Sequence, residues 1–217
     1  MVEINKIKSI TIWIFIIPFF AINACLILIT NFHQFFDGKD VILSTIPYID
    51  GGASISRTAR VFPTYLIFKP AMFITSYLLI KYWIYNKKII HNFDPENKNI
   101  KKFIFFGIGS AVLLTIHSIF LGIKFDYSIY KFFRRFIMVA FIIFEIAAQA
   151  YLVLTLYKLK DKLINNINLF VLKLKMILVS VLITVAIIAI PIVSMPGNKH
   201  FKHALEWDYF VGVILFY

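Results

Sequence analysis

Three ionisable side chains lie inside long apolar runs of this sequence: Lys69 in LIFKPAMF, His117 in TIHSIF and Glu145 in FIIFEIAAQA. A charge in hydrocarbon costs about 2.5–3.5 kcal/mol even on a lenient insertion scale, so such residues are expected to be paired or functional. Lys69 and Glu145 could form an ion pair, or Lys69 could extend along its own helix to the surface. His117 could act as a general base oriented by Glu145, or it could be a packing residue.

The arginines form a second set of residues with possible chemistry. All four arginines lie in or beside loops on one predicted side of the membrane. In the loops on the opposite side, every Lys or Arg position is a lysine. The four arginines are Arg57, Arg60, Arg134 and Arg135. The planar guanidinium group binds phosphate or carboxylate with two parallel hydrogen bonds, whereas lysine acts as a point charge. We therefore expect an anion to bind on the arginine side; the alternative is that these residues anchor helix ends at the level of the lipid headgroups.

The segment PYIDGGASISRTAR, residues 47–60, concentrates small and charged residues between two apolar runs. Asp50-Gly51-Gly52 predicts a sharp turn with positive φ. If SISRTAR is helical, Arg57 and Arg60 are three positions apart and point to one side, just outside the membrane. Hydroxyl groups of the same segment would add donors to a lipid phosphate there: Ser54, Ser56 and Thr58. Lys69 would lie beneath this site.

A third set lies in KHFKHALEWDYF, where His203 and Glu206 have the spacing of metal ligands on one helical face. A metal site would need a third ligand, for which His117 is the only candidate on that side, so no metal or other cofactor is predicted. Glu206 could instead orient His117 in catalysis. Alternatively, the carboxylates of Glu206 and Asp208 could be stabilised by the positive N-terminal end of a helix dipole.

The elements that position these residues are transmembrane helices. The chain of 217 residues is 60% hydrophobic with a mean hydropathy of +0.83, which excludes an ordinary soluble domain. Hydropathy predicts spans over roughly 9–30, 63–84, 103–123, 135–157 and 176–194, each near the length that a bilayer requires. A sixth begins at Trp207 and stops at Tyr217. We expect an all-α, polytopic membrane helical bundle of about six transmembrane helices, the last one truncated, with residues 1–217 as a single transmembrane domain.

Basic residues predict the orientation of the bundle. Twelve of the 23, all lysines, lie in the N-terminal segment and in the loops 85–102 and 158–175. The positive-inside rule then places the N-terminus in the cytoplasm and the arginines outside, and we expect a plasma-membrane location. The net charge of +12 fits membrane-flanking lysines that face anionic lipid, so nucleic acid is not an expected partner. The single cysteine, Cys25, excludes a disulfide framework.

The order of these features resembles the Frag/DRAM/Sfk family of six-helix membrane proteins, also called the Cwh-type N-terminal membrane domain. The resemblance rests on PYIDGGASISRTARVFP, the pair His117-Ser118 and the dipeptide Glu206-Trp207. Members of that family are implicated in glycolipid-anchor remodelling and phospholipid organisation, so the resemblance implies work on lipid. Lys69 and the short final helix depart from the family pattern.

Three functions follow as hypotheses. The first is binding or organising of phospholipid or glycolipid headgroups, anionic or phosphate-containing, at the non-cytosolic leaflet. The second is a lipid-modifying enzyme for acyl transfer or hydrolysis, with His117 as base and Glu145 or Glu206 as its partner. The third is a small-solute transporter, although no paired set of broken helices is evident. A His–carboxylate pair would favour catalysis, and a cavity lined by arginines without that pair would favour binding.

Overall fold

The computed structural model describes residues 2–123, 127–163, 167–194 and 197–217, and within these ranges it contains helices and no strands. The apolar runs fold as six long helices. They are α1 (Val2–Asn31), α4 (Tyr65–Phe93), α5 (Asn99–Phe120), α6 (Ser128–Lys158), α7 (Leu169–Ser194) and α8 (Lys199–Leu215). Three short helices follow α1: η1 (His33–Phe35), α2 (Pro47–Asp50) and α3 (Ile55–Ala59).

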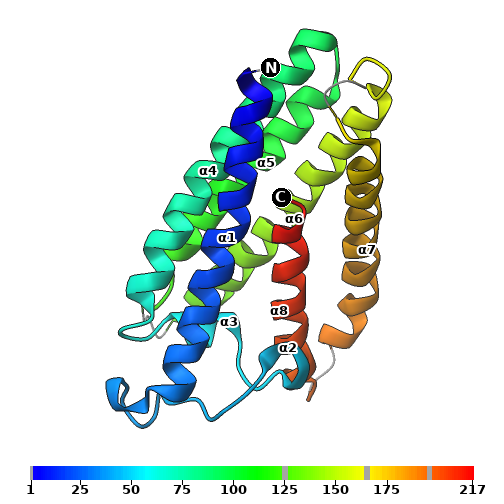
Figure 1. The fold of residues 1–217 in the computed structure, drawn as a ribbon. Coiled ribbons are helices and arrows are strands. Elements are labelled where there is room, and N and C mark those ends of the chain that lie inside the picture. The colour runs from blue at the N-terminus through cyan, green and yellow to red at the C-terminus, as the bar shows by residue number, and fades with distance from the viewer. Residues whose placement is uncertain (1, 124–126, 164–166, 195–196) are drawn as a thin grey trace.

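The long helices run alternately up and down and form a ring (Figure 1). α4 packs against α1 and α5, α5 against α6, and α6 against α7, while α8 contacts both α7 and α1. The short helices α2 and α3 contact α8 and α1, at the end where α1 finishes. We call this end, which holds Arg57, Arg60, Arg134 and Arg135, the arginine end. The opposite end, with the α4–α5 and α6–α7 connections, is the lysine end.

Four of the helices are long and apolar enough to cross a bilayer. Their apolar spans are Glu3–Asn31, Asn99–Phe120, Phe132–Lys158 and Leu169–Ala189. The prediction of a helical, multi-pass membrane protein is therefore confirmed at this level. α4 contains Lys69 and Lys81 in its apolar part, and α8 has only 17 residues; neither is among the four. Several helices also extend past the predicted spans, because lysine-rich turns continue them beyond the apolar core.

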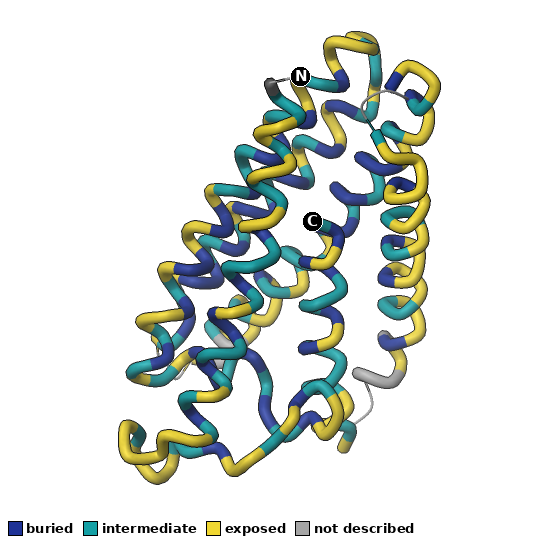
Figure 2. The backbone as a smooth tube through the Cα atoms, viewed as in Figure 1, coloured by how far each residue is buried: buried dark blue, intermediate teal, exposed yellow. Residues whose placement is uncertain are grey.

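Close packing of α5 places its polar face toward the centre of the ring. A Cβ atom on Gly107 would lie 2.4 Å from the ring of Trp83 on α4, so the absent side chain lets the two helices approach. Ser110, His117 and Ser118 share the same side of α5 and are buried. By contrast, α7 has an outward face of exposed apolar side chains, which suits contact with lipid (Figure 2).

Candidate functional site

The glycine turn of residues 50–53 is the surface on which α8 docks. The indole N–H of Trp207 donates to the carbonyl of Ala53 at 2.8 Å. His203 Nδ1 lies 3.0 Å from the carbonyl of Gly51, and His200 Nδ1 lies 3.2 Å from the carbonyl of Asp50. A carbonyl oxygen only accepts, so each Nδ1 acts as a donor. One face of α8 therefore satisfies three backbone carbonyl groups of this turn, those of Asp50, Gly51 and Ala53, which would otherwise need water.

Gly51 is required at this turn for two reasons. Its φ of +60° lies in the left-handed region, which side chains rarely adopt. A Cβ atom there would also lie 1.7 Å from the carbonyl oxygen of His200. The Asp50 carboxylate closes the turn by accepting from the Thr45 hydroxyl, from Ile46 N–H at 2.9 Å and from Gly52 N–H at 2.8 Å. These donors, the Thr45 hydroxyl first, lower the pKa of Asp50.

Glu206 faces the start of α3. Its carboxyl group lies beside the backbone N–H groups of Ser56 and Ile55, the unpaired donors of the first turn. Ser54 caps the same turn, because its side chain accepts from Arg57 N–H at 3.2 Å. His203 and Glu206 thus contact backbone. In the described part of the chain, no three His, Cys, Asp or Glu side chains cluster as a metal site.

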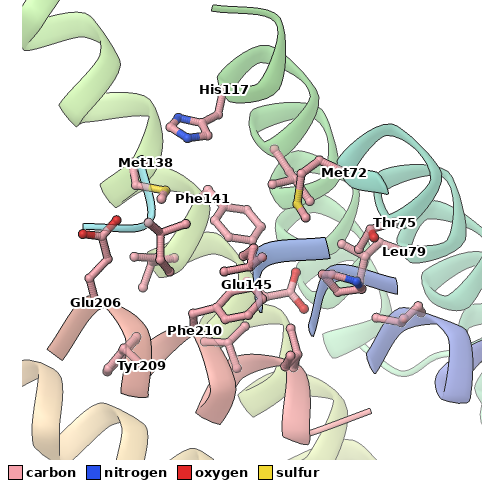
Figure 3. A pocket seen from close by; sticks show the side chains of 18 of the residues that line it. Met72, Thr75, Leu79, His117, Met138, Phe141, Glu145, Glu206, Tyr209 and Phe210 are labelled. Carbon is pink, nitrogen blue, oxygen red and sulfur yellow. The ribbon is translucent and has the colours of Figure 1, made fainter. Parts of the chain in front are cut away.

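An inner cavity of about 70 Å³ lies at the centre of the ring, between α8 and the layer formed by α1, α4, α5 and α6. His117 from α5, Glu145 from α6 and Glu206 from α8 all line it (Figure 3). Aliphatic and aromatic side chains form the rest of the wall. The surface that the wall exposes to the cavity is apolar. The three candidate catalytic residues therefore share one cavity, although they come from separate helices.

The carboxyl group of Glu145 is paired with uncharged groups. Its oxygens lie within hydrogen-bonding distance of Ser110 Oγ, Tyr217 OH and, at 3.2 Å, Gln149 Nε2. Gln149 Nε2 also donates to the carbonyl of Val213 at 3.1 Å, which joins α6 to α8. The expected ion pair with Lys69 is wrong: Lys69 Nζ donates to the carbonyl of Ile119 at 3.3 Å, near the end of α5.

The hydrogen-bond arrangement of Glu145 favours a neutral carboxylic acid. Ser110 has one hydroxyl proton, and its Oγ lies 2.8 Å from the carbonyl of Gly107, which can only accept. When Ser110 donates to Gly107, its oxygen can accept a proton from Glu145 Oε2. Tyr217 and Gln149 then donate to Oε1. One proton on Glu145 thus satisfies both of its own oxygens and the Ser110 hydroxyl, and no cation pairs with this group among the described residues. Gln149 Oε1 has no hydrogen-bond partner there.

His117 has no carboxylate partner of this kind. No hydrogen bond joins its ring to Glu145 or Glu206 in the described ranges, and Glu145 is hydrogen-bonded to Ser110, Tyr217 and Gln149. The charged group that acts on the His117 ring electrostatically is the guanidinium of Arg134. A base that lacks an orienting carboxylate is a weak candidate for general base catalysis.

A second, polar cavity of about 260 Å³ lies at the arginine end. Arg60 and Arg134, from separate segments of the chain, both line it, together with Asp40. Gly122 forms part of the wall with a φ of +86°, and a Cβ atom on it would lie 2.8 Å from the carbonyl oxygen of Arg60. The turn after α5 can therefore close against the segment before α4. We call this hollow the arginine cavity.

Arg134 is held in place within the arginine cavity. Its Nη2 donates to Ser56 Oγ at 3.3 Å, and its guanidinium group lies 5.9 Å from the ring centroid of Tyr130. Its Nε is buried and has no hydrogen-bond partner among the described residues.

The structure brings together part of the predicted arginine set. Arg60 and Arg134 share a cavity, and Ser56 contacts Arg134. Arg57, Arg135 and Lys69 do not line it, and the Ser54 side chain is used as a helix cap. Sequence reasoning did not identify Asp40, Ser110 or Tyr217. Only Ser110 gave a signal, since it lies seven positions before His117 and so on the same helical face.

Fold and site together define a multi-pass helical membrane protein with a polar cavity at one end and an apolar cavity deeper in the ring. Comparison with known protein families, with curated proteins and with solved structures finds no match to this chain.

Proposed function

We propose that this protein binds the phosphate-bearing headgroup of a membrane lipid in the arginine cavity. The observation that carries the proposal is that Arg60 and Arg134, from distant parts of the chain, line one hollow of about 260 Å³. Guanidinium groups bind phosphate oxygens bidentately, so two of them in one hollow suit a phosphate group. In this proposal α4 and α8 also lie within the membrane, the N-terminus is cytoplasmic, and the headgroup belongs to the non-cytosolic leaflet.

The position of the inner cavity supports a lipid over a soluble anion. Met138, which lines the inner cavity, lies one helical turn from Arg134 on α6. Ile55 and His117 also line the inner cavity, and each lies five positions before a residue of the arginine cavity, Arg60 and Gly122. An apolar cavity of about 70 Å³ beneath a cationic one matches an amphiphile whose headgroup lies at the surface.

Binding is better supported than catalysis. A lipid-modifying enzyme would need a base and an orienting acid in contact, and among the described residues no hydrogen bond joins His117 to Glu145 or Glu206. Other contacts give Glu145 and Glu206 positioning roles: Glu145 ties α5 to α6 and to Tyr217, and Glu206 holds the start of α3. His117 is then a packing residue in the wall of the inner cavity.

Thermal melting of the purified full chain with added phospholipid tests the proposal. We expect phosphatidylglycerol to raise the melting temperature of the wild type, because a ligand bound only by the folded state stabilises it. Diacylglycerol, which lacks the phosphate, should give no such shift. Arg134→Gln should abolish the phospholipid effect, whereas Arg135→Gln, a neighbouring and exposed charge outside the cavity, should retain it. Equal stabilisation of both variants would contradict the proposal.

A further inference from the structure

The arginine cavity contains an acidic group as well as two basic ones. Asp40, from the loop between η1 and α2, is half-buried and lines the cavity with Arg60 and Arg134. Across the described ranges, the side chains of Asp40 and Arg60 form no hydrogen bond or ion pair. Opposite charges that face one hollow without pairing leave space between them for a ligand.

The charges of the cavity specify the charges of that ligand. Two guanidinium groups call for an anion, and a carboxylate calls for a cation. A purely anionic headgroup would place its phosphate near Asp40 and leave this carboxylate partly desolvated without a partner, which is unfavourable. A headgroup that carries a phosphodiester and an ammonium group would satisfy all three side chains.

The size and walls of the cavity narrow the choice further. About 260 Å³ is smaller than the roughly 300–1,000 Å³ of pockets for drug-sized ligands, so the cavity suits a compact headgroup better than an oligosaccharide. Phe62 is the one aromatic side chain among the described lining residues, whereas quaternary ammonium groups are usually bound in cages of several aromatic rings. A primary ammonium group, with three N–H donors, is the better partner for a carboxylate.

We infer that the preferred ligand is a zwitterionic lipid of the phosphatidylethanolamine type, an inference that rests on the headgroup site proposed above. Arg60 and Arg134 hold the phosphodiester, and Asp40 accepts hydrogen bonds from the primary ammonium group. Asp40 is therefore a specificity residue. It selects among phospholipids that the two arginines alone would bind alike.

Competition between lipids, measured by native mass spectrometry on the full chain, tests this inference. The protein is offered equal amounts of phosphatidylethanolamine, phosphatidylglycerol and phosphatidylcholine with identical acyl chains. We expect the wild type to prefer phosphatidylethanolamine over each of the others by about tenfold, the scale of one charge-assisted hydrogen bond. Asp40→Asn should remove this preference while phosphatidylglycerol still binds. Asp37→Asn, in the same loop but outside the cavity, should keep the preference.

The arms of this experiment separate the inference from the site on which it rests. An unchanged ratio of phosphatidylethanolamine to phosphatidylglycerol in Asp40→Asn would overturn the role of Asp40. Equal binding of phosphatidylcholine by the wild type would overturn the choice of a primary ammonium group. Arg134→Gln should lose all three lipids, and full retention of phosphatidylglycerol by that variant would instead overturn the headgroup site itself.

Discussion

Trp207 and Ala53 are separated by 154 positions in the sequence, yet the indole N–H of Trp207 donates to the Ala53 carbonyl at 2.8 Å. The Trp207 side chain is fully buried, and its ring lies edge-on to Tyr48 with the centroids 5.0 Å apart. This contact attaches α8 to the loop that carries α3 and therefore Arg60. The position of the arginine cavity thus depends on the docking of the last helix.

Replacement of Trp207 should destabilise the protein, and by more in Trp207→Ala than in Trp207→Phe. Trp207→Phe keeps most of the ring but leaves the Ala53 carbonyl without its donor, at a cost of about 1–3 kcal/mol. Trp207→Ala should cost about 3–5 kcal/mol because a large buried side chain is lost. Thermal melting in a fixed detergent measures both. Trp13→Phe, at a half-exposed position on α1, is the matched control and should change the melting temperature little.

Gly51→Ala should also release α8 from the turn. The new Cβ would have to occupy the space of the His200 carbonyl oxygen, 1.7 Å away, and the backbone would be held at a φ of +60°. We expect a loss of more than about 1 kcal/mol of stability. Gly38→Ala is the control, since nothing lies within 4 Å of a Cβ at that position. If the two variants melt at the same temperature, the docking contact is not as described.

The pKa of Asp50 predicts how the turn responds to acid. Hydrogen bonds from Thr45, Gly52 and Ile46 lower the pKa of Asp50 below its ordinary value of 3.8, so the folded state favours the ionised carboxylate. Its contribution to stability is therefore present above the ordinary value and is lost as the pH falls through the lowered one. Asp50→Asn should be less stable at neutral pH and should lose less on acidification. Parallel pH profiles of the melting temperature would disagree with this account.

Glu145 should tolerate replacement by glutamine and resist replacement by leucine. Glutamine can accept from Tyr217 and Gln149 and donate to Ser110, as the neutral acid does. Leucine would leave those groups unpaired in the ring, at about 1–3 kcal/mol for each. Infrared spectroscopy offers a direct check, because a protonated carboxyl band of the wild type should vanish in Glu145→Gln. If the two variants are equally destabilised, Glu145 is a carboxylate and the neutral assignment is wrong.

The apolar runs predicted the helices well, because hydrocarbon imposes a continuous apolar length on each crossing segment. The type of loop was also predictable at residues 50–52, where Gly51 has a positive φ in a turn. Boundaries were less predictable, since helices such as α4 continue through lysine-rich turns after the apolar core has ended.

Pairing between helices could not be predicted from spacing. Depth along the membrane suggested Lys69 and Glu145 as partners. However, α4 and α6 both pack against α5, and Lys69 reaches only the end of α5. Asp40 gave no signal because its role depends on a loop folding over a cavity. The arginine side, in contrast, was evident from composition. Which two of the four arginines share a cavity required the arrangement of α3, α5 and α6.

The most direct test of the headgroup site compares two double variants that each remove two positive charges from the arginine end. The amount of phospholipid that remains bound to the purified protein is measured by native mass spectrometry. Arg60→Gln/Arg134→Gln, which empties the cavity of guanidinium groups, should lose at least about tenfold of the bound phospholipid. Arg57→Gln/Arg135→Gln should keep it. Equal retention by the two double variants would contradict a headgroup site between Arg60 and Arg134.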